Sequence, residues 1–306
     1  MLRLGYLSGP RPDGMDCERP VRWGVSDAGE PYRVEIRRCG DKREKQCRPC
    51  SARYRRRVQS VAFEGMVKPR GLLGQLTLTA PSQLGQHCLR PGCSSTSCDH
   101  KKCPCTPVGG ISLAQWNATC SKRWADLLRM LTHHYGSRPS YFRAVECQDG
   151  KRCADGVGRG ALHLHVVCRF DHEVTVKTLR RLAIRAGFGH EVDWQPITPG
   201  SAHAVKVAGY VSKYVTKATG ARDEVPWSLP VTDPDTGLVV AFEPSRATYR
   251  TWSQSRTWGK TMAEVKAAAV ARYRVQEQLR LLREHLAAGG SLATAPLPVP
   301  GPEPAD

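Results

Sequence analysis

Residues 161–170, with the sequence ALHLHVVCRF, constrain the fold of this chain more than any other segment. Apolar and polar side chains alternate at its start, which is typical of a β-strand. Successive side chains of a strand point to opposite faces, so His163 and His165 share one face while Leu164 packs on the other. The segment therefore predicts a strand that presents two imidazoles side by side.

The rest of the chain alternates irregularly between short strands and helices. Alternation within the strands favours an α+β fold with an antiparallel sheet, flanked by helices, over a doubly wound parallel sheet. The expected strands are 71–81, 141–147, 161–170 and 191–194, and the expected helices begin near 112, 175, 202 and 261. The predicted division has four parts: a basic cysteine-rich zinc module at 1–60, a central domain at 61–225 with a cysteine-rich insertion at 85–110, a loop and long helix at 226–290, and a disordered Pro-rich tail at 291–306.

The charge of the chain indicates a polyanionic partner. Lys and Arg number 46 against 28 Asp and Glu, a net charge of +18. Such an excess favours nucleic acid, although a ribosome-associated or membrane-surface protein shows the same sum. No apolar stretch is long enough to span a membrane, and the first residues lack the apolar run of a signal peptide, so we expect a cytoplasmic protein without a membrane partner.

The histidine pair is suited to a divalent cation. Two imidazoles on one rigid face can chelate a metal, and Glu146, at the end of the preceding expected strand, can reach the same ion if the two strands pair. The alternative is a half-exposed strand whose outer face happens to carry histidines. An isolated pair of this kind favours that alternative, because short motifs match by chance.

A later segment, GYVSKYVTK at 209–217, carries two tyrosines four residues apart. On a helix they lie on one face, about 6 Å apart along the axis. Lysines nearby favour a phenolate, which makes each tyrosine a candidate nucleophile toward a phosphodiester, with Tyr214, Tyr210, Lys213 and Lys217 as the catalytic set. The alternative is a pair of core tyrosines beside lysines that reach for solvent.

Thirteen cysteines without a secretory signal favour metal binding over disulfides. Cys39, Cys47 and Cys50 end in a C-x-x-C knuckle, and Cys17 can complete a four-thiolate zinc site. Reduced, buried thiols are the alternative. A second zinc ion can be held within Cys88–Cys105, where spacing does not select the ligands. Ten Lys and Arg residues lie within 37–57, and four of them are expected to contact DNA phosphates: Arg53, Arg55, Arg56 and Arg57.

Taken together, HLHVV followed by YVSKYVTK resembles the second and third motifs of the HUH endonuclease superfamily, in particular its rolling-circle replication initiators. The strand GQLTLTAP resembles the first motif, and the order of the three matches over roughly residues 70–220. N-terminal cysteine motifs of this kind also precede the catalytic domain in many actinobacterial plasmid initiators. The resemblance implies an HUH/RRM-like sheet and makes 61–225 the catalytic domain.

The same resemblance implies the roles of the candidate residues. His163 and His165 would bind Mg²⁺ or Mn²⁺ with Glu146 as third ligand, and Tyr214 would attack the scissile phosphate of origin DNA. Tyr210 stands where some relatives carry a glutamate, which implies a second strand transfer in place of hydrolysis. A host helicase and a DNA polymerase would be partners.

Two other readings remain open. A conjugative relaxase or single-strand transposase shares the histidine pair and the tyrosine. Relaxases, however, usually carry the tyrosine before the histidines, and the transposases are shorter. A non-catalytic zinc-containing DNA-binding regulator explains the charge and the cysteines but gives no role to His163, His165 or the tyrosine helix.

Overall fold

The computed structural model describes residues 2–6, 15–25, 33–68, 70–81, 113–147, 160–221, 225, 227–236, 239–289 and 291. It divides into two compact units, residues 1–258 and residues 259–306. The fold is α+β with an antiparallel sheet, as the sequence predicted. None of the described helices combines the length and the apolar character that a membrane span requires.

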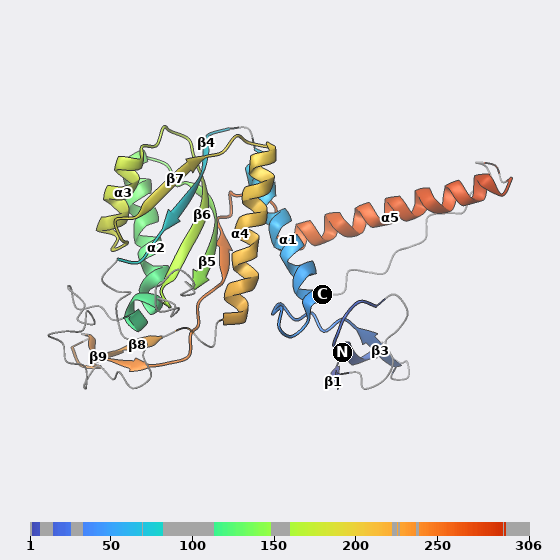
Figure 1. Ribbon diagram of the computed structural model, residues 1–306, viewed down its shortest axis with the longest axis horizontal. Helices are drawn as coiled ribbons and strands as arrows, with labels where there is room; N and C mark the ends of the chain where they lie inside the picture. Colours follow the sequence, from blue (N-terminus) through green and yellow to red (C-terminus); the bar gives the residue numbers. More distant parts are fainter. Residues whose placement is uncertain are drawn as a thin grey trace, which may run out of the picture. The chain divides into compact units, whose positions relative to one another are not determined.

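The first unit is built on a five-stranded sheet (Figure 1). Its strand order is β10-β5-β6-β4-β7, and every neighbouring pair is antiparallel. Four of these strands were predicted, whereas β10 was not. The strands are β4 (Leu72–Leu78), β5 (Ser140–Cys147), β6 (Leu162–Phe170), β7 (Val192–Pro196) and β10 (Trp252–Gln254).

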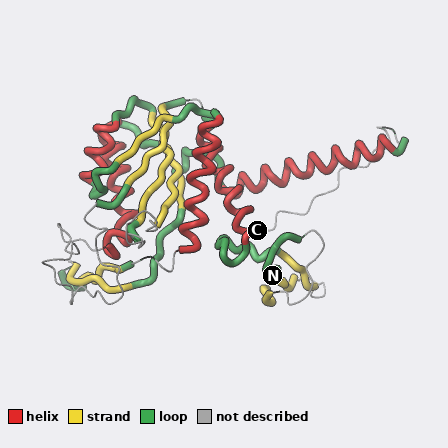
Figure 2. The backbone as a smooth tube through the Cα atoms, viewed as in Figure 1, coloured by secondary structure: helices red, strands yellow, loops and turns green. Residues whose placement is uncertain are grey.

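Helices cover both faces of this sheet (Figures 1 and 2). On one face lie α2 (Leu113–Tyr135) and α3 (Val176–Arg185); on the other lie α1 (Arg48–Met66) and α4 (Ala202–Ala221). The face toward α2 contributes Leu164 and Val166 to a core that also contains Trp116 and Leu127. The strand β6 is therefore covered on both sides, and its histidines face α4.

The helix α1 was not predicted. Its short apolar stripe consists of Val58, Val61, Ala62 and Met66, which are all fully buried. The arginines of the same helix obscure the helical spacing of these residues in the sequence. Proline at the first turn suits a helix start, because its missing N–H has no partner there in any case. Tertiary packing on α4 supplies the stability that a basic segment of low apolar content lacks alone.

No strand was predicted before residue 71, but the structure has three there among the described residues. They form an antiparallel sheet of β1 (Leu2–Tyr6), β2 (Val21–Val25) and β3 (Arg33–Arg37). A further pair, β8 (Ser228–Thr232) and β9 (Val239–Pro244), forms a small two-stranded sheet. Short strands rich in Arg, Gly and Pro give little periodic signal.

The structure divides the chain differently from the prediction. A boundary at residue 60 would fall inside α1, which is a continuous helix. Residues 226–258 belong to the first unit, because β10 pairs with β5. The second unit contains α5 (Met262–Ala287), which begins where a helix start was predicted, at a capping box formed by Thr261 and Glu264. The cysteine-rich insertion at 85–110 and the tail beyond residue 291 lie outside the described residues.

Candidate active site and cysteine cluster

The pairing of β5 with β6 brings the predicted carboxylate to the predicted histidines. In this register Glu146 lies opposite His163, and Ala144 lies opposite His165. All four residues share the face of the sheet that α4 covers, because side chains alternate along each strand. The small Ala144 side chain leaves room beside the His165 ring, so Glu146 can reach that ring diagonally.

Glu146 is the centre of a small polar network. Its Oε2 lies 2.8 Å from His165 Nε2, and its Oε1 accepts a hydrogen bond of 3.0 Å from Lys217 Nζ. Burial alone would raise the pKa of the Glu146 carboxyl, but the hydrogen bonds from His165 and Lys217 outweigh it and hold that pKa below its usual value. Glu146 is therefore a carboxylate at neutral pH.

Both tyrosines of α4 lie against His165. The Tyr214 ring stacks on the imidazole, with a centroid distance of 4.1 Å and an interplanar angle of 9°. The Tyr210 ring meets the same imidazole edge-on at 5.5 Å, and the two phenol rings are 4.8 Å apart. Tyr210 is 42% exposed, whereas Tyr214 is half-buried. The two candidate nucleophiles thus occupy one site with the histidine.

The helical spacing of α4 explains this arrangement. Val207, Val211 and Val215 are buried and form an apolar stripe along α4, which packs on β5. Positions 210, 214 and 217 follow one another at intervals of four and three, so their side chains share the adjoining face. Docking the valine stripe therefore turns both phenols and the Lys217 ammonium toward β5 and β6.

The arrangement of His165 and Glu146 suits a shared divalent cation. A cation with ligand bonds of about 2.1 Å holds adjacent octahedral ligands about 3 Å apart, close to the 2.8 Å between His165 Nε2 and Glu146 Oε2. His165 Nδ1 is buried and has no hydrogen-bond partner among the described residues. His163 is half-buried and lies across from Glu146. Among the described residues, only the four cysteines discussed below gather three or more possible ligand atoms closely enough for a metal. For His163, His165 and Glu146 to hold Mg²⁺ or Mn²⁺, the cation would replace the direct hydrogen bond between His165 and Glu146.

The predicted lysines differ in their surroundings. Lys217 bonds to the Glu146 carboxylate, a partner that the sequence did not indicate. Lys213 is exposed on α4 and takes no part in the contacts among Glu146, His165 and Tyr214 described above. Opposite charges far apart in sequence have no local pattern, so sequence reasoning could not have found the pair of Glu146 and Lys217.

The four predicted zinc ligands come together near the start of α1. The sulfur atoms of Cys17, Cys39, Cys47 and Cys50 all lie within 4.8 Å of one another. Cys17 Sγ is 3.8 Å from Cys47 Sγ and 3.6 Å from Cys50 Sγ. These distances are too long for disulfides. A tetrahedral zinc ion with Zn–S bonds of about 2.3 Å holds its sulfurs about 3.8 Å apart, so the cluster is consistent with a structural zinc site.

The thiols of this cluster are electrostatically unequal. Burial would raise the pKa of Cys47, but hydrogen bonds from the backbone N–H groups of Cys50 and Glu18 and from neighbouring thiols lower it to about 7. Burial raises the pKa of Cys39 and of Cys50. Without a cation, adjacent thiolates repel one another, so ionisation of Cys47 disfavours ionisation of Cys39 and Cys50; a bound zinc ion would stabilise these thiolates.

The predicted DNA-contacting arginines lie on α1. Arg55, Arg56 and Arg57 are exposed, and Arg53 is half-buried. Arg55 and Arg56 line a hollow of about 330 Å³ that is also bordered by Thr216 of the tyrosine helix α4. Basic residues therefore follow α1 from the cysteine cluster to the helix that carries both tyrosines, and Glu44 is the one acidic residue among the described residues that line the hollow.

No protein-family model, curated protein or solved structure matches this chain. Its function must therefore be inferred from the residues of the site and their geometry.

Proposed function

We propose that this protein is a rolling-circle replication initiator, a metal-dependent endonuclease that nicks and rejoins single-stranded origin DNA through a tyrosine. The observation that carries the proposal is the stacking of Tyr214 on His165 at 4.1 Å, beside a Glu146 carboxylate bonded to the same imidazole. A phenol, an imidazole and a carboxylate in one place are the groups that such phosphoryl transfer requires.

In the proposed reaction Tyr214 Oη attacks the scissile phosphorus. The Oη–P bond forms as the bond from phosphorus to the 3′ oxygen breaks, the phenol proton is lost, and the 3′ oxygen gains a proton. The products are a 5′-phosphotyrosyl link and a free 3′-hydroxyl that a host polymerase can extend while a host helicase unwinds. One phosphate ester bond replaces another, so the phosphotyrosyl bond retains the energy needed for rejoining the strand.

His163, His165 and Glu146 would hold the Mg²⁺ or Mn²⁺, and a divalent cation there would supply a Lewis acid that lowers the charge of the scissile phosphate. Lys217 holds the Glu146 carboxylate in place and adds positive charge beside the phenols. Lys213, on the exposed side of the same helix, suits a contact with a neighbouring DNA phosphate.

Tyr210 is suited to the second transfer. Its ring lies 4.8 Å from that of Tyr214 and against the same imidazole, so it can reach the same phosphate position once Tyr214 is occupied. Attack by Tyr210 on the regenerated junction would release a strand end with a 3′-hydroxyl. That hydroxyl can then displace Tyr214 and close the circle. Two adjacent phenols support repeated transesterification over hydrolysis.

Recognition of DNA would use the cationic surface of α1. Arg55 and Arg56 border α4 through the hollow they share with Thr216, and Arg53 and Arg57 flank them on the same helix. Phosphate contacts of this kind position a strand without reading its sequence. The zinc cluster, which includes Cys47 and Cys50 at the start of α1, would hold this helix at its angle to the sheet.

The test is covalent capture. The protein is incubated with Mn²⁺ and a labelled library of random single-stranded DNA, and adducts that survive denaturation are counted and digested for mass spectrometry. We expect a nucleotide on the peptide that contains Tyr214. Tyr214→Phe should lower adduct yield at least about a hundredfold, because phenylalanine lacks the nucleophile. Tyr210→Phe should form the adduct but fail to transfer the strand.

The control is Tyr273→Phe on α5, where the tyrosine is 67% exposed; its adduct yield should equal that of the wild type. Full yield from Tyr214→Phe would show that the assigned nucleophile is wrong. Absence of any adduct with Mn²⁺ or Mg²⁺ would favour the alternative that the protein is a non-catalytic, zinc-containing DNA-binding regulator. An adduct without circle closure would favour a relaxase or transposase activity of the same site.

A further inference from the structure

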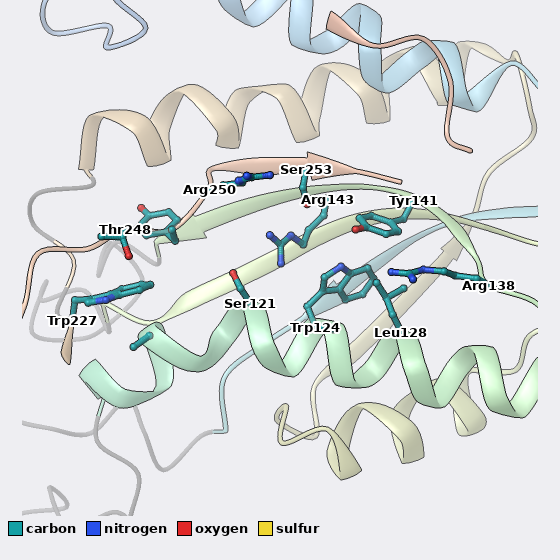
Figure 3. A pocket seen from close by; sticks show the side chains of 13 residues that line it. Ser121, Trp124, Leu128, Arg138, Tyr141, Arg143, Trp227, Thr248, Arg250 and Ser253 are labelled. Atoms are coloured by element: carbon teal, nitrogen blue, oxygen red, sulfur yellow. The ribbon is translucent and has the colours of Figure 1, made fainter. Parts of the chain in front are cut away.

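A second site lies on the opposite face of the sheet from Tyr214. A cavity of about 460 Å³ opens between α2, β5, β10 and the segment around residue 249. Figure 3 shows Arg143 reaching from the sheet into the space above Ser121 and Trp124 of α2, while α4 lies on the far side of the sheet. This space, called here the Arg143 cavity, shares no residue with the tyrosine site.

Arg143 is a buried cation without a counter-ion. The residue is 5% exposed, and its Nε is buried with no hydrogen-bond partner among the described residues. No carboxylate in the described part of the chain forms an ion pair with it, and burial lowers its pKa. A buried, unpaired guanidinium is costly for a fold. A ligand that supplies the missing acceptors would relieve this cost.

The remaining polar groups of the cavity point to the same ligand chemistry. The indole nitrogens of Trp124 and Trp227, which line it, are also buried donors without an acceptor in the described residues. Arg138 and Arg250 are exposed lining residues, and no lining residue is acidic. Three buried donors, from Arg143, Trp124 and Trp227, therefore lack an acceptor among the described residues, and the two exposed arginines add positive charge, so the cavity fits an acceptor-rich anion.

We propose that the Arg143 cavity binds one nucleotide unit, with its phosphate on Arg143. A guanidinium matches phosphate oxygens with two parallel hydrogen bonds. The apolar part of the lining, which includes Trp124, Tyr141 and Trp227, suits a sugar and a planar base. A volume of about 460 Å³ lies within the range of small-molecule sites. The unit can come from a free nucleotide or from a nucleic-acid strand.

This inference does not rest on the proposed nicking activity. The cavity would bind its ligand whether or not Tyr214 is a nucleophile, so failure of one proposal leaves the other testable. If the source is a strand, the site anchors nucleic acid on the face remote from His165. If the source is a free nucleotide, the site is a separate ligand pocket.

The experiment measures binding of inorganic phosphate, thymidine, thymidine monophosphate and a short oligothymidylate to the full chain. Binding is followed by calorimetry and by the fluorescence of the lining tryptophans. We expect phosphate and the monophosphate, or the oligonucleotide, to bind, and thymidine to bind at least about tenfold more weakly because it lacks the charge. Arg143→Met should weaken this binding by about tenfold to a hundredfold.

Two comparisons separate a binding role from a structural one. Without ligand, Arg143→Met should melt at or above the wild-type temperature, because it removes an unpaired buried charge. Arg180→Gln, an equal change of charge at an exposed position of α3 outside the cavity, should leave monophosphate affinity unchanged. The rim variant Arg250→Gln, which alters only an exposed side chain, provides the measurement if Arg143→Met fails to fold, and it should weaken binding several-fold.

The binding results distinguish the two sources of the ligand. Binding of the monophosphate that depends on Arg143 supports a free nucleotide. Binding confined to the oligonucleotide, and weakened by Arg143→Met more than by Arg180→Gln, supports a strand. No binding by any probe, or equal binding by the wild type and the Arg143 and Arg250 variants, would overturn the proposal.

Discussion

Replacing Glu146 with glutamine should lower the free energy of unfolding by about 1–3 kcal/mol. The carboxylate receives a charge-assisted hydrogen bond from Lys217 and lies 2.8 Å from His165 Nε2, and its side chain is only 16% exposed. Glutamine keeps the size and one neutral hydrogen bond but removes the negative charge that Lys217 contacts at 3.0 Å. The Lys217 side chain is 36% exposed, so water compensates part of the loss.

The pH dependence has a definite sign. Because the pKa of Glu146 in the folded state lies below its ordinary value of 4.5, the carboxylate adds stability that is fully present above about pH 5. That stability is lost as the pH falls through the folded-state pKa. The difference between the wild type and Glu146→Gln should therefore be constant near neutrality and shrink in acid.

The assay is urea unfolding followed by circular dichroism, without added Mg²⁺ or Mn²⁺ and without a chelator, so that the metal content of the cysteine cluster stays unchanged. Glu173→Gln, at an exposed position, is the matched control and should change stability by less than about 0.5 kcal/mol. A double-mutant cycle with Lys217→Met should give a coupling above about 0.5 kcal/mol. Equal stability of Glu146→Gln and the wild type, or no coupling energy between Glu146 and Lys217, would refute a stabilising interaction between these two residues.

Two further predictions concern the fold around the site. Cys17→Ser should remove one bound zinc ion per chain, measured by elemental analysis, and lower the melting temperature, because metal binding energy is folding energy; an unchanged zinc content would contradict the cluster. Gly65→Ala should cost about 1–3 kcal/mol, because its Cβ would lie 2.1 Å from the Trp258 ring. Gly209→Ala, whose Cβ meets only the end of Gln59 at 3.4 Å, should be neutral or stabilising by up to about 1 kcal/mol; equal losses in both alanine variants, measured by chemical unfolding, would refute this contrast.

The strands and helices around the site were predictable because their signals are local. Alternation marked β6, and a fourfold spacing of tyrosines marked one face of α4. The helix α1 was missed because its apolar stripe is short and lies among arginines. The strand β10 was missed because three residues carry no periodicity; their partner, β5, is more than a hundred residues away along the chain.

Among the candidate residues, too, those with a local sequence pattern were predicted and those without one were not. Cys39, Cys47 and Cys50 are close in sequence and were recognised by spacing, whereas Cys17 was assigned only as a fourth thiol of suitable chemistry. The structure brings it within 3.6 Å of Cys50. The Arg143 cavity had no sequence signal at all, because an arginine within a strand is expected on an exposed surface.

Sequence by itself determined which side chains share a strand face or a helix face, since that depends only on the repeat of each backbone. It thereby paired His163 with His165 and Tyr210 with Tyr214. Only the tertiary structure decided that these faces meet, that Lys217 bonds to Glu146, and that Arg143 Nε is buried without a hydrogen-bond partner among the described residues. Those outcomes depend on how apolar surfaces far apart along the chain pack, and no local pattern of residues encodes that choice.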